Sequence, residues 1–275
     1  MSQDLRGNHL PLQIDDLRRL RTGARMGSVI HYFESVDSTN TVAHRLAVEG
    51  APEGAVVIAE AQTRGRGRLG RAWVSPPFRN AYVSVVLRPQ MPADGAARIT
   101  LVAGLAVLEA VAEWDPRAAI KWPNDVVIDG RKIAGILTEL EADAEGVRFV
   151  ILGIGVNLNI SAEDFPEDLR DRAIGLAAAT GGAIDRVLFI DRLLTRLDDC
   201  YGRFVRAGFA AIRPLWEAGS CLTGKRVEIV EGRQRHAGVA IGIDNGGALL
   251  LRGHGGETIR VVAGDVTVLD GYGTT

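Results

Sequence analysis

The densest run of chemically useful side chains lies between Arg64 and Trp73, where the sequence reads RGRGRLGRAW. Four arginines and three glycines fall within its first eight positions. Glycine lets a backbone approach a ligand closely, and the guanidinium group offers planar donors to a carboxylate or a phosphate. Because like charges repel and glycine is costly to order, we expect a loop that is mobile until an anion binds. An RNA-contacting loop and a merely solvated loop would have the same composition, so these residues alone leave three interpretations open.

A second polar run, KWPND, occupies residues 121–125. Proline fixes φ and Asn-Asp favours a turn, so an ordinary turn would explain this run by itself. Asp129-Gly130 then predicts a two-residue hairpin that leads into an apolar strand beginning near Lys132. A lysine at such a position reaches to solvent, pairs with a carboxylate or serves a ligand.

Two shorter motifs complete the set of candidate site residues. The run DSTN at 37–40 is predicted to cap the helix that follows it. The run GIGVNLN at 153–159 places two glycines in an apolar strand, which indicates a bulge or the close approach of another group. It lacks the third glycine and the following helix of a dinucleotide-binding fingerprint. The sequence also holds no P-loop, HExxH motif, nucleophile elbow or Cys/His metal cluster, and its five scattered histidines are interpreted as structural or surface residues.

The elements that would position these motifs are short strands with helices between groups of them. Strands are expected at 29–33, 55–60, 81–87, 120–122, 126–128, 132–139 and 147–158, and helices at 12–20, 41–48, 100–114 and 184–204. This order predicts an α+β fold with a mixed or antiparallel sheet and flanking helices. Five further short strands, at 226–230, 237–243, 248–252, 258–262 and 266–269, predict a small C-terminal five-stranded β-barrel. We therefore divide the chain into an N-terminal extension (1–25), a core domain (26–218) and a barrel domain (219–275).

The overall composition excludes several classes of protein. Of the 275 residues, 47% are hydrophobic and 24% are charged, which is typical of a folded globular chain rather than a disordered one. The formal net charge of −2 argues against a bulk electrostatic grip on nucleic acid. The N-terminus does not resemble a signal peptide, and the longest apolar stretch contains Glu109 and is too short to cross a bilayer. We expect a cytoplasmic protein that does not bind membranes.

Taken in order, the motifs resemble those of the biotin protein ligase family. The runs that carry the resemblance are DSTN at 37–40, QTRGRGRLGRAW at 62–73, KWPND at 121–125, KIAGILTE at 132–139 and GIGVNLN at 153–159. It extends over roughly residues 28–270, a biotin/lipoate ligase-like catalytic core followed by a C-terminal barrel. The resemblance implies that biotin and Mg-ATP form biotinyl-5′-AMP and pyrophosphate, after which biotin passes to a lysine of a biotin carboxyl carrier protein. Neither step needs an enzyme nucleophile, which agrees with the lack of a Ser/His or Cys/His arrangement.

The resemblance also assigns roles residue by residue. Catalytic roles are implied for Arg66, Arg68, Asp125 and Lys132, with Asp125 either orienting Lys132 or accepting the proton of the acceptor lysine. The biotin-binding set is Ser38, Thr39, Asn40, Gln62, Gly65, Arg66, Gly67, Arg68, Lys132, Gly135 and Gly153. The ATP-binding set is Arg68, Arg71, Trp73, Asn124, Lys132 and Asn157. No side chain is assigned directly to a metal, because Mg²⁺ is expected to arrive with ATP.

The sequence departs from the family pattern in two places. Arg64 stands where the family usually has a small residue. About 27 residues precede the first core strand, which is too few for the winged helix-turn-helix domain of the family's dual-function members. We therefore expect a monofunctional ligase that does not bind DNA. An exposed sheet edge could pair two subunits, so a homodimer is left open.

Three alternative functions are weighed against this one. A lipoate ligase or octanoyl transferase would share the fold, but the GRGRLGR and KWPND runs argue against it. A nucleic-acid-binding protein would use the Arg/Gly loop, but that loop is short and contains no tyrosine or phenylalanine. A biotin-binding regulator without catalysis is disfavoured because Lys132 and all the arginines are present.

Overall fold

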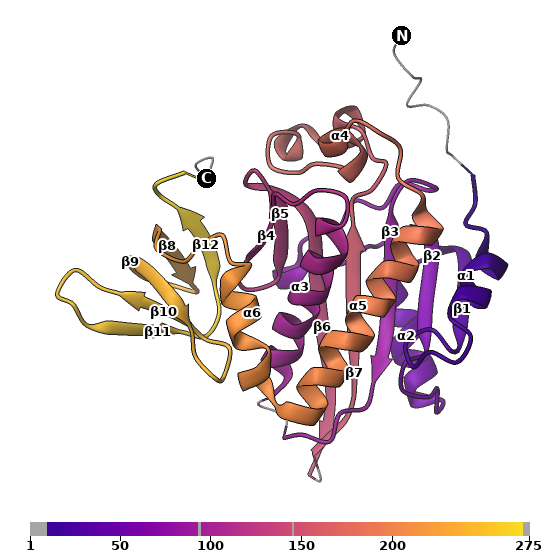
Figure 1. Cartoon of the computed structure of the whole chain (residues 1–275), viewed down its shortest axis with the longest axis horizontal. Coiled ribbons are helices and arrows are strands. Elements are labelled where there is room, and N and C mark those ends of the chain that lie inside the picture. Colours follow the sequence, from indigo (N-terminus) through magenta and orange to yellow (C-terminus); the bar gives the residue numbers. More distant parts are fainter. Residues whose placement is uncertain (1–9, 93–94, 145, 272–275) are drawn as a thin grey trace.

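The computed structural model describes residues 10–92, 95–144 and 146–271 of the chain. These residues form two lobes (Figure 1). The large lobe is built on a seven-stranded sheet with helices on both faces, and the small lobe is built on five antiparallel strands. This is the α+β architecture that the sequence predicted, with the mixed sheet in the middle of the chain and the five short strands after it.

The strands of the large sheet run in the order β1-β2-β3-β7-β6-β5-β4. The edge pair β1 and β2 is parallel, because the helix α2 (Thr39–Val48) crosses between them, and the other described pairs are antiparallel. Asp129 and Gly130 form the predicted hairpin turn, both with positive φ, as a type I′ turn requires. The bounds are β1 (Ile30–Val36), β2 (Val56–Gln62), β3 (Ala81–Leu87), β4 (Ala118–Lys121), β5 (Asp125–Ile128), β6 (Arg131–Asp143) and β7 (Gly146–Val156).

Helices cover both faces of this sheet (Figure 1). On one face α2 packs against β2, β3 and β7 through a small apolar cluster that includes Val42, Val57 and Phe149. On the other face lies the main core, where α3 (Ala96–Ala112) is packed between the sheet and the long helix α5 (Arg186–Ala207). Because α3 has protein on two sides, it is apolar around most of its circumference. The face that carries α2 is less completely covered, and the candidate site residues lie there.

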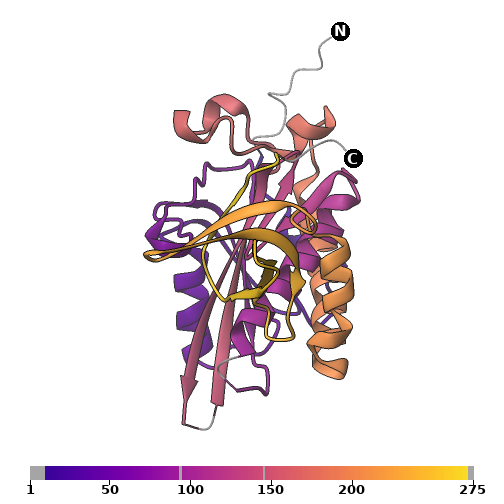
Figure 2. The ribbon, with the colours of Figure 1, turned by 90° about the vertical axis from the view of Figure 1, so that its left-hand side faces the viewer.

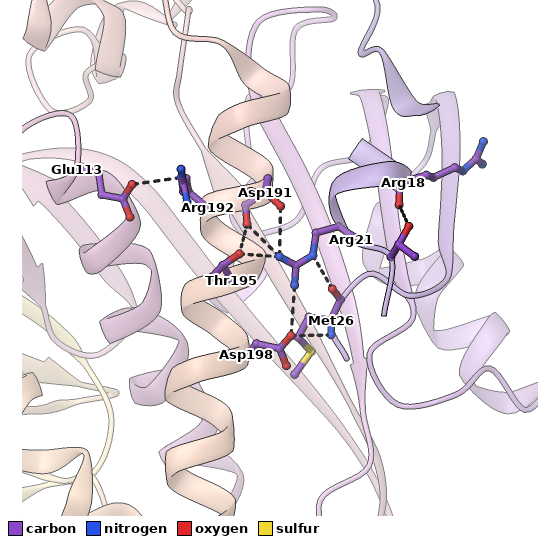
Figure 3. A network of polar contacts seen from close by, with 9 residues as sticks. Arg18, Arg21, Met26, Glu113, Asp191, Arg192, Thr195 and Asp198 are labelled. Atoms are coloured by element: carbon purple, nitrogen blue, oxygen red, sulfur yellow. Dashed lines mark hydrogen bonds and ion pairs between the residues drawn. The ribbon is translucent and has the colours of Figure 1, made fainter. Parts of the chain in front are cut away.

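The segment before β1 is part of the large lobe (Figure 3). Its helix α1 (Ile14–Leu20) buries Leu17 in the main core. The Arg21 guanidinium is also buried and donates to Thr195 Oγ1 at 2.6 Å, and it contacts the carboxylates of Asp191 and Asp198 at 3.3 Å. These three partners lie on α5, so this hydrogen-bonded cation fixes the segment to the longest helix of the lobe. Residues 1–9 of the proposed extension lie outside the described residues.

The small lobe contains the five strands that the sequence predicted, each within about three residues of its expected limits. They run in the order β11-β10-β9-β8-β12, so β11 and β12 are the two edges of the sheet. In Figure 2 this lobe faces the viewer and lies against one end of the large sheet. Trp122 anchors it, because its buried indole Nε1 donates to the carbonyl of Gly247 at 3.0 Å. The bounds are β8 (Arg226–Glu231), β9 (Gln234–Ile243), β10 (Leu249–Arg252), β11 (Thr258–Val261) and β12 (Asp265–Val268).

Some details differ from the predicted elements. The helix expected at 100–114 begins four positions earlier, at Ala96, and the helices α4 (Leu176–Thr180) and α6 (Arg213–Ala218) were not predicted. Helices of five and six residues are too short to show the periodicity that identifies a helix. Within the described part of the chain, no helix is both long and apolar enough to cross a membrane.

Candidate active site

Three glycines form the floor of the site on the face of the sheet that carries α2. Gly135 of β6 and Gly155 of β7 are paired across the two strands, and Gly153 lies two residues before Gly155. A Cβ atom built on Gly155 would lie 2.6 Å from the Trp73 indole, and one on Gly153 would lie 2.2 Å from Asn40 Oδ1. Any larger residue would therefore push these side chains away. The two-glycine motif marks a close approach, as predicted, because Asn40 and Trp73 pack directly on the sheet at Gly153 and Gly155. We call this strip of the sheet, from Gly153 to Gly135, the groove.

A chain of hydrogen bonds lines the Gly153 end of the groove. The backbone N–H of Thr39 donates to Gln62 Oε1 at 2.9 Å, and Gln62 Nε2 donates to Ser75 Oγ at 3.0 Å. The Ser75 hydroxyl in turn donates to the carbonyl of Trp73 at 3.0 Å. Ser84 of β3 is fully buried and donates to Asn40 Oδ1 at 2.6 Å. This wall brings together polar groups from α2, β2, β3 and the Arg/Gly loop.

The run DSTN lies at the start of α2, but it does not cap this helix through a side chain as predicted. Ser38 occupies the N-cap position, but its side chain makes no capping hydrogen bond. Ser38, Thr39 and Asn40 are all buried instead, and the last two face the site through Gln62 and Ser84. The helix start therefore serves to hold polar side chains over the groove.

Glu139 of β6 connects this wall to the Arg/Gly loop. Its Oε2 atom accepts a hydrogen bond from Asn40 Nδ2 at 2.7 Å and another from the Arg66 guanidinium at 2.8 Å. The loop itself is a small hairpin, in which Arg66 and Ala72 form an isolated bridge. Gly65 at its base has no room for a side chain, because a Cβ atom would lie 2.5 Å from the Trp73 carbonyl.

A bulge in β6 brings Lys132 to the other end of the groove. Across from β5, Asp125 pairs with Gly135 and Val126 with Ala134, but Val127 pairs with Lys132. One extra residue of β6 is inserted here, which turns Lys132 to the same face as Gly135. Its Nζ lies 2.6 Å from Asp125 Oδ1 and 5.2 Å from the centre of the Trp73 ring. Lys132 is therefore held between a carboxylate and an aromatic face.

The backbone of Lys132 is also held in place. Its N–H donates to the carbonyl of Arg172 at 2.7 Å, and its carbonyl accepts from the N–H of Ile174 at 3.0 Å. Asn157, at the end of β7, donates its side-chain amide to the same carbonyl at 3.4 Å. The segment around residue 173 thus extends the sheet beside Lys132 and fixes the direction of its side chain.

The remaining loop arginines contact the core and the small lobe. Arg68 donates to Asn124 Oδ1 at 3.0 Å, and Asn124 Nδ2 donates to the Ile136 carbonyl at 2.8 Å. Burial lowers the pKa of Arg68, which stays charged because arginine titrates far above neutral pH. A cleft of about 190 Å³ opens beside this pair, between the start of α3 and the small lobe. Arg71 forms an ion pair with Asp265 at the start of β12.

The contacts described above link most of the residues predicted for the site to one another. The predicted biotin set clusters around the groove, and Arg68, Asn124, Lys132 and Asn157 lie at its far end. Arg64, by contrast, is exposed. Prediction missed four residues that complete the arrangement, namely Ser75, Ser84, Glu139 and Asp265. Only Glu139 carried a signal, as the last residue of the KIAGILTE run.

Comparison with known proteins agrees with this geometry. Residues 32–157, which contain all the predicted site residues, match the sequence model of the biotin/lipoate A/B protein ligase family. A biotin–[acetyl-CoA-carboxylase] ligase of Paracoccus denitrificans is 40% identical over 228 residues, which is 81% of this chain and 94% of that protein. This chain belongs to the biotin protein ligase family.

Two further relatives extend the comparison. The bifunctional ligase/repressor BirA of Bacillus spizizenii is 40% identical over 82% of this chain and 70% of that protein. A biotin protein ligase of Aquifex aeolicus, solved in complex with biotin and ATP, superimposes with a TM-score of 0.75 at 30% identity. The match covers 87% of this chain and 98% of the Aquifex chain, so it includes both lobes. Both the ligase and the ligase/repressor types are thus among the relatives of this biotin protein ligase.

Proposed function

We propose that this chain is a biotin–[acetyl-CoA-carboxylase] ligase, which joins biotin to ATP and then passes the biotinyl group to a carrier lysine. The observation that carries the proposal is the glycine-floored groove with a polar wall at one end and Lys132 at the other. Biotin has the same polarity, because a ureido head with two N–H donors and one carbonyl is joined by an apolar tail to a carboxylate. The head would face Asn40 and Gln62, and the carboxylate would face Lys132.

The polar wall also supports biotin over the acids of the sister enzymes. The ureido group of biotin could extend the hydrogen bonds of Asn40 and Gln62, whereas a dithiolane ring or a plain alkyl chain offers them no donor or acceptor. A polar group that a ligand covers without giving it a partner costs about 1–3 kcal/mol. A site that forms hydrogen bonds with its substrate therefore strongly rejects an analogue that lacks the donors and acceptors. An apolar pocket rejects an analogue with one additional methylene or hydroxyl group much more weakly. This argues against lipoate and octanoate as the preferred substrates.

The first step brings together two anions, the biotin carboxylate and the triphosphate of ATP. Because like charges repel, the site must supply positive charge. An oxygen of the biotin carboxylate attacks the α-phosphorus of ATP, a new P–O bond forms, and the bond to the pyrophosphate leaving group breaks. Lys132 would contact the attacking carboxylate and the phosphoryl oxygens, while Arg68 would neutralise the phosphate side. The ion pair with Asp125 holds the Lys132 ammonium in one direction, so little reorganisation is needed when charge builds up.

In the second step the amine of the acceptor lysine attacks the acyl carbon of the adenylate. A C–N bond forms, the C–O bond to AMP breaks, and AMP leaves as its phosphate anion. The amine must lose a proton, and Asp125 is the carboxylate at the Lys132 end of the groove. Since its oxygen already faces an ammonium ion, we propose that the main role of Asp125 is to orient Lys132 and that the proton passes to solvent.

The metal is expected to come with the nucleotide. Within the described residues no group of three or more histidine, cysteine, aspartate or glutamate side chains could form a metal cage. Mg²⁺ commonly keeps several waters and binds through one or two carboxylates together with substrate phosphates. Asp125 Oδ1 and Asn124 Oδ1 already contact the Lys132 ammonium and the Arg68 guanidinium, so we propose that the phosphates of ATP and water hold most of the coordination sphere of Mg²⁺.

The contacts of the Arg/Gly loop argue against a nucleic-acid function. Arg66, Arg68 and Arg71 each contact a partner within the protein, respectively Glu139, Asn124 and Asp265. A cation that is already paired within the protein offers less charge to a phosphate backbone than an unpaired one. We therefore propose that the chain does not bind DNA, that it works in the cytoplasm, and that its macromolecular partner is a biotin carboxyl carrier protein.

The test is transfer to a carrier. The purified chain is incubated with biotin, Mg-ATP and a biotin carboxyl carrier domain, and the carrier is then weighed by intact mass spectrometry. The proposal expects a gain of one biotinyl group on the carrier and none on a variant in which arginine replaces the acceptor lysine. A carrier that takes up lipoyl or octanoyl groups instead, or nothing, would contradict it.

A further inference from the structure

One carboxylate oxygen joins the wall of the groove to the loop that would cover it. Glu139 Oε2 lies 2.7 Å from Asn40 Nδ2 and 2.8 Å from the Arg66 guanidinium. Asn40 lies in the first turn of α2, Glu139 lies on β6, and Arg66 lies at the base of the loop hairpin. These three elements are far apart in the sequence, and Glu139 joins the first to the third through two side-chain hydrogen bonds.

The first consequence concerns the orientation of Asn40. Its Oδ1 accepts from the Ser84 hydroxyl at 2.6 Å, and its Nδ2 donates to Glu139. An amide held at both ends cannot flip, so the face that it presents to a ligand is fixed. Asn40 also lies over Gly153, at the end of the groove assigned to the biotin head.

The second consequence concerns the loop. At the C-terminal end of the loop, the Trp73 carbonyl accepts a hydrogen bond from Ser75, whose hydroxyl in turn accepts one from Gln62. At its N-terminal end the Arg66 side chain is tied to Glu139 in a charge-assisted hydrogen bond, which is stronger than a neutral one. Both ends of the loop are therefore attached to the same polar wall. The polar wall thus holds the loop in place at both ends.

We propose that Glu139 is a positioning residue for biotin: it fixes the amide of Asn40 and, through Arg66, holds the loop against the polar wall, and it thereby sets how long biotin stays bound. This inference rests on the proposed function, because it takes biotin as the occupant of the groove. Glu139 acts through Asn40 and Arg66 and has no part in the chemistry at Lys132. Its loss should affect retention of biotin and leave the reaction rate at saturating biotin unchanged.

The experiment compares Glu139→Gln with a matched control, Glu141→Gln. Glutamine keeps an oxygen for Asn40 but loses the charge that attracts Arg66. Glu141 lies two residues further along β6, is similarly exposed, and contacts His44 and Arg148 at 3.6 and 3.8 Å instead of the site. Dissociation of labelled biotin into excess unlabelled biotin is measured for both variants, together with KM and kcat for biotin-dependent ATP–pyrophosphate exchange.

The expected result for Glu139→Gln is an increase of about tenfold in the rate of biotin dissociation and a similar increase in KM for biotin. Its kcat and KM for ATP should stay within about twofold of wild type, and Glu141→Gln should match wild type throughout. In an Arg66→Ala background the added effect of Glu139→Gln should largely disappear, since the two residues act together.

Three results would overturn the inference. The first is unchanged biotin dissociation in Glu139→Gln. The second is a fall in kcat, or a rise in KM for ATP, as large as the rise in KM for biotin. The third is an undiminished effect of Glu139→Gln in the Arg66→Ala background. The two proposals fail separately. Wild-type protein without biotin-dependent exchange would refute the ligase function, whereas normal exchange with unchanged dissociation in the variant would refute only the role of Glu139.

Discussion

The ammonium of Lys132 lies 2.6 Å from the Asp125 carboxylate because strand β6 contains one residue more than its partner β5 at this point. Without the bulge, the alternation of side chains along a strand would turn Lys132 to the opposite face of the sheet. The bulge places it beside Gly135, which pairs directly with Asp125. The pairing register of β5 and β6 thus determines where the Lys132 side chain lies.

Asp125→Asn tests the orienting role of this carboxylate. Asparagine keeps the size of the side chain but removes the charge that holds the Lys132 ammonium. We expect kcat for ATP–pyrophosphate exchange with biotin to fall about tenfold or more, with little change in KM for biotin. Transfer from chemically prepared biotinyl-5′-AMP to the carrier should proceed at the wild-type rate. Normal exchange together with slow transfer would show instead that Asp125 accepts the proton of the acceptor lysine.

Gly155→Ala tests the groove. The added methyl group would lie 2.6 Å from Cε2 and Nε1 of Trp73, so the indole must move. We expect kcat/KM for biotin to fall by about tenfold or more, because a shifted Trp73 no longer contacts Lys132. Gly182→Ala is the matched control, since a Cβ atom at that glycine meets nothing within 4 Å. Equal activity of the two variants would contradict the assignment of the groove.

Asp265→Asn tests whether the small lobe holds the Arg/Gly loop. The Asp265 carboxylate pairs with Arg71, which the family resemblance assigns to the ATP-binding set. We expect KM for ATP to rise a few-fold, while the free energy of unfolding changes by less than about 1 kcal/mol because the pair is exposed. Glu228→Gln, which breaks the exposed pair with Arg235 in the same sheet, should leave KM for ATP unchanged. A higher KM in both variants would indicate a general effect of the lobe.

The buried carboxylate of Asp115 gives a pH-dependent prediction for stability. Hydrogen bonds from the Arg117 side chain hold the pKa of Asp115 below its usual value, which outweighs the opposite effect of burial. A depressed pKa in the folded state stabilises the protein above the ordinary aspartate value, and this contribution is lost as the pH falls through the folded-state pKa. Asp115→Asn should lower Tm by a few degrees at pH 7, and the gap should narrow below about pH 4. A gap that does not vary with pH would contradict this assignment.

Local signals explain the parts of the fold that the sequence could predict. The strand at 81–87 was predicted with its observed limits, and the helix expected at 184–204 was found at Arg186–Ala207. The Asp129-Gly130 turn was also correct. Each of these depends on hydrophobic periodicity or on the backbone preferences of a few adjacent residues. Such information is present in the local sequence.

The missed residues depend on pairing between distant segments. Glu139 contacts Arg66 only because β6 and the loop meet over the same face of the sheet, 73 positions apart in the chain. Asp265 reaches Arg71 across 194 positions. The bulge that turns Lys132 becomes visible only once the register of β5 and β6 is known. No periodicity in a single segment encodes these relationships, so sequence patterns could indicate candidate site residues but not the contacts between them.

The measurement that tests the account most directly is ATP–pyrophosphate exchange by the purified wild-type chain, with biotin, lipoate and octanoate offered in parallel. The groove and its polar wall predict exchange that depends on biotin and is at least about a hundredfold weaker with the other two acids. Exchange with lipoate or octanoate at a rate equal to or above that with biotin would contradict the account.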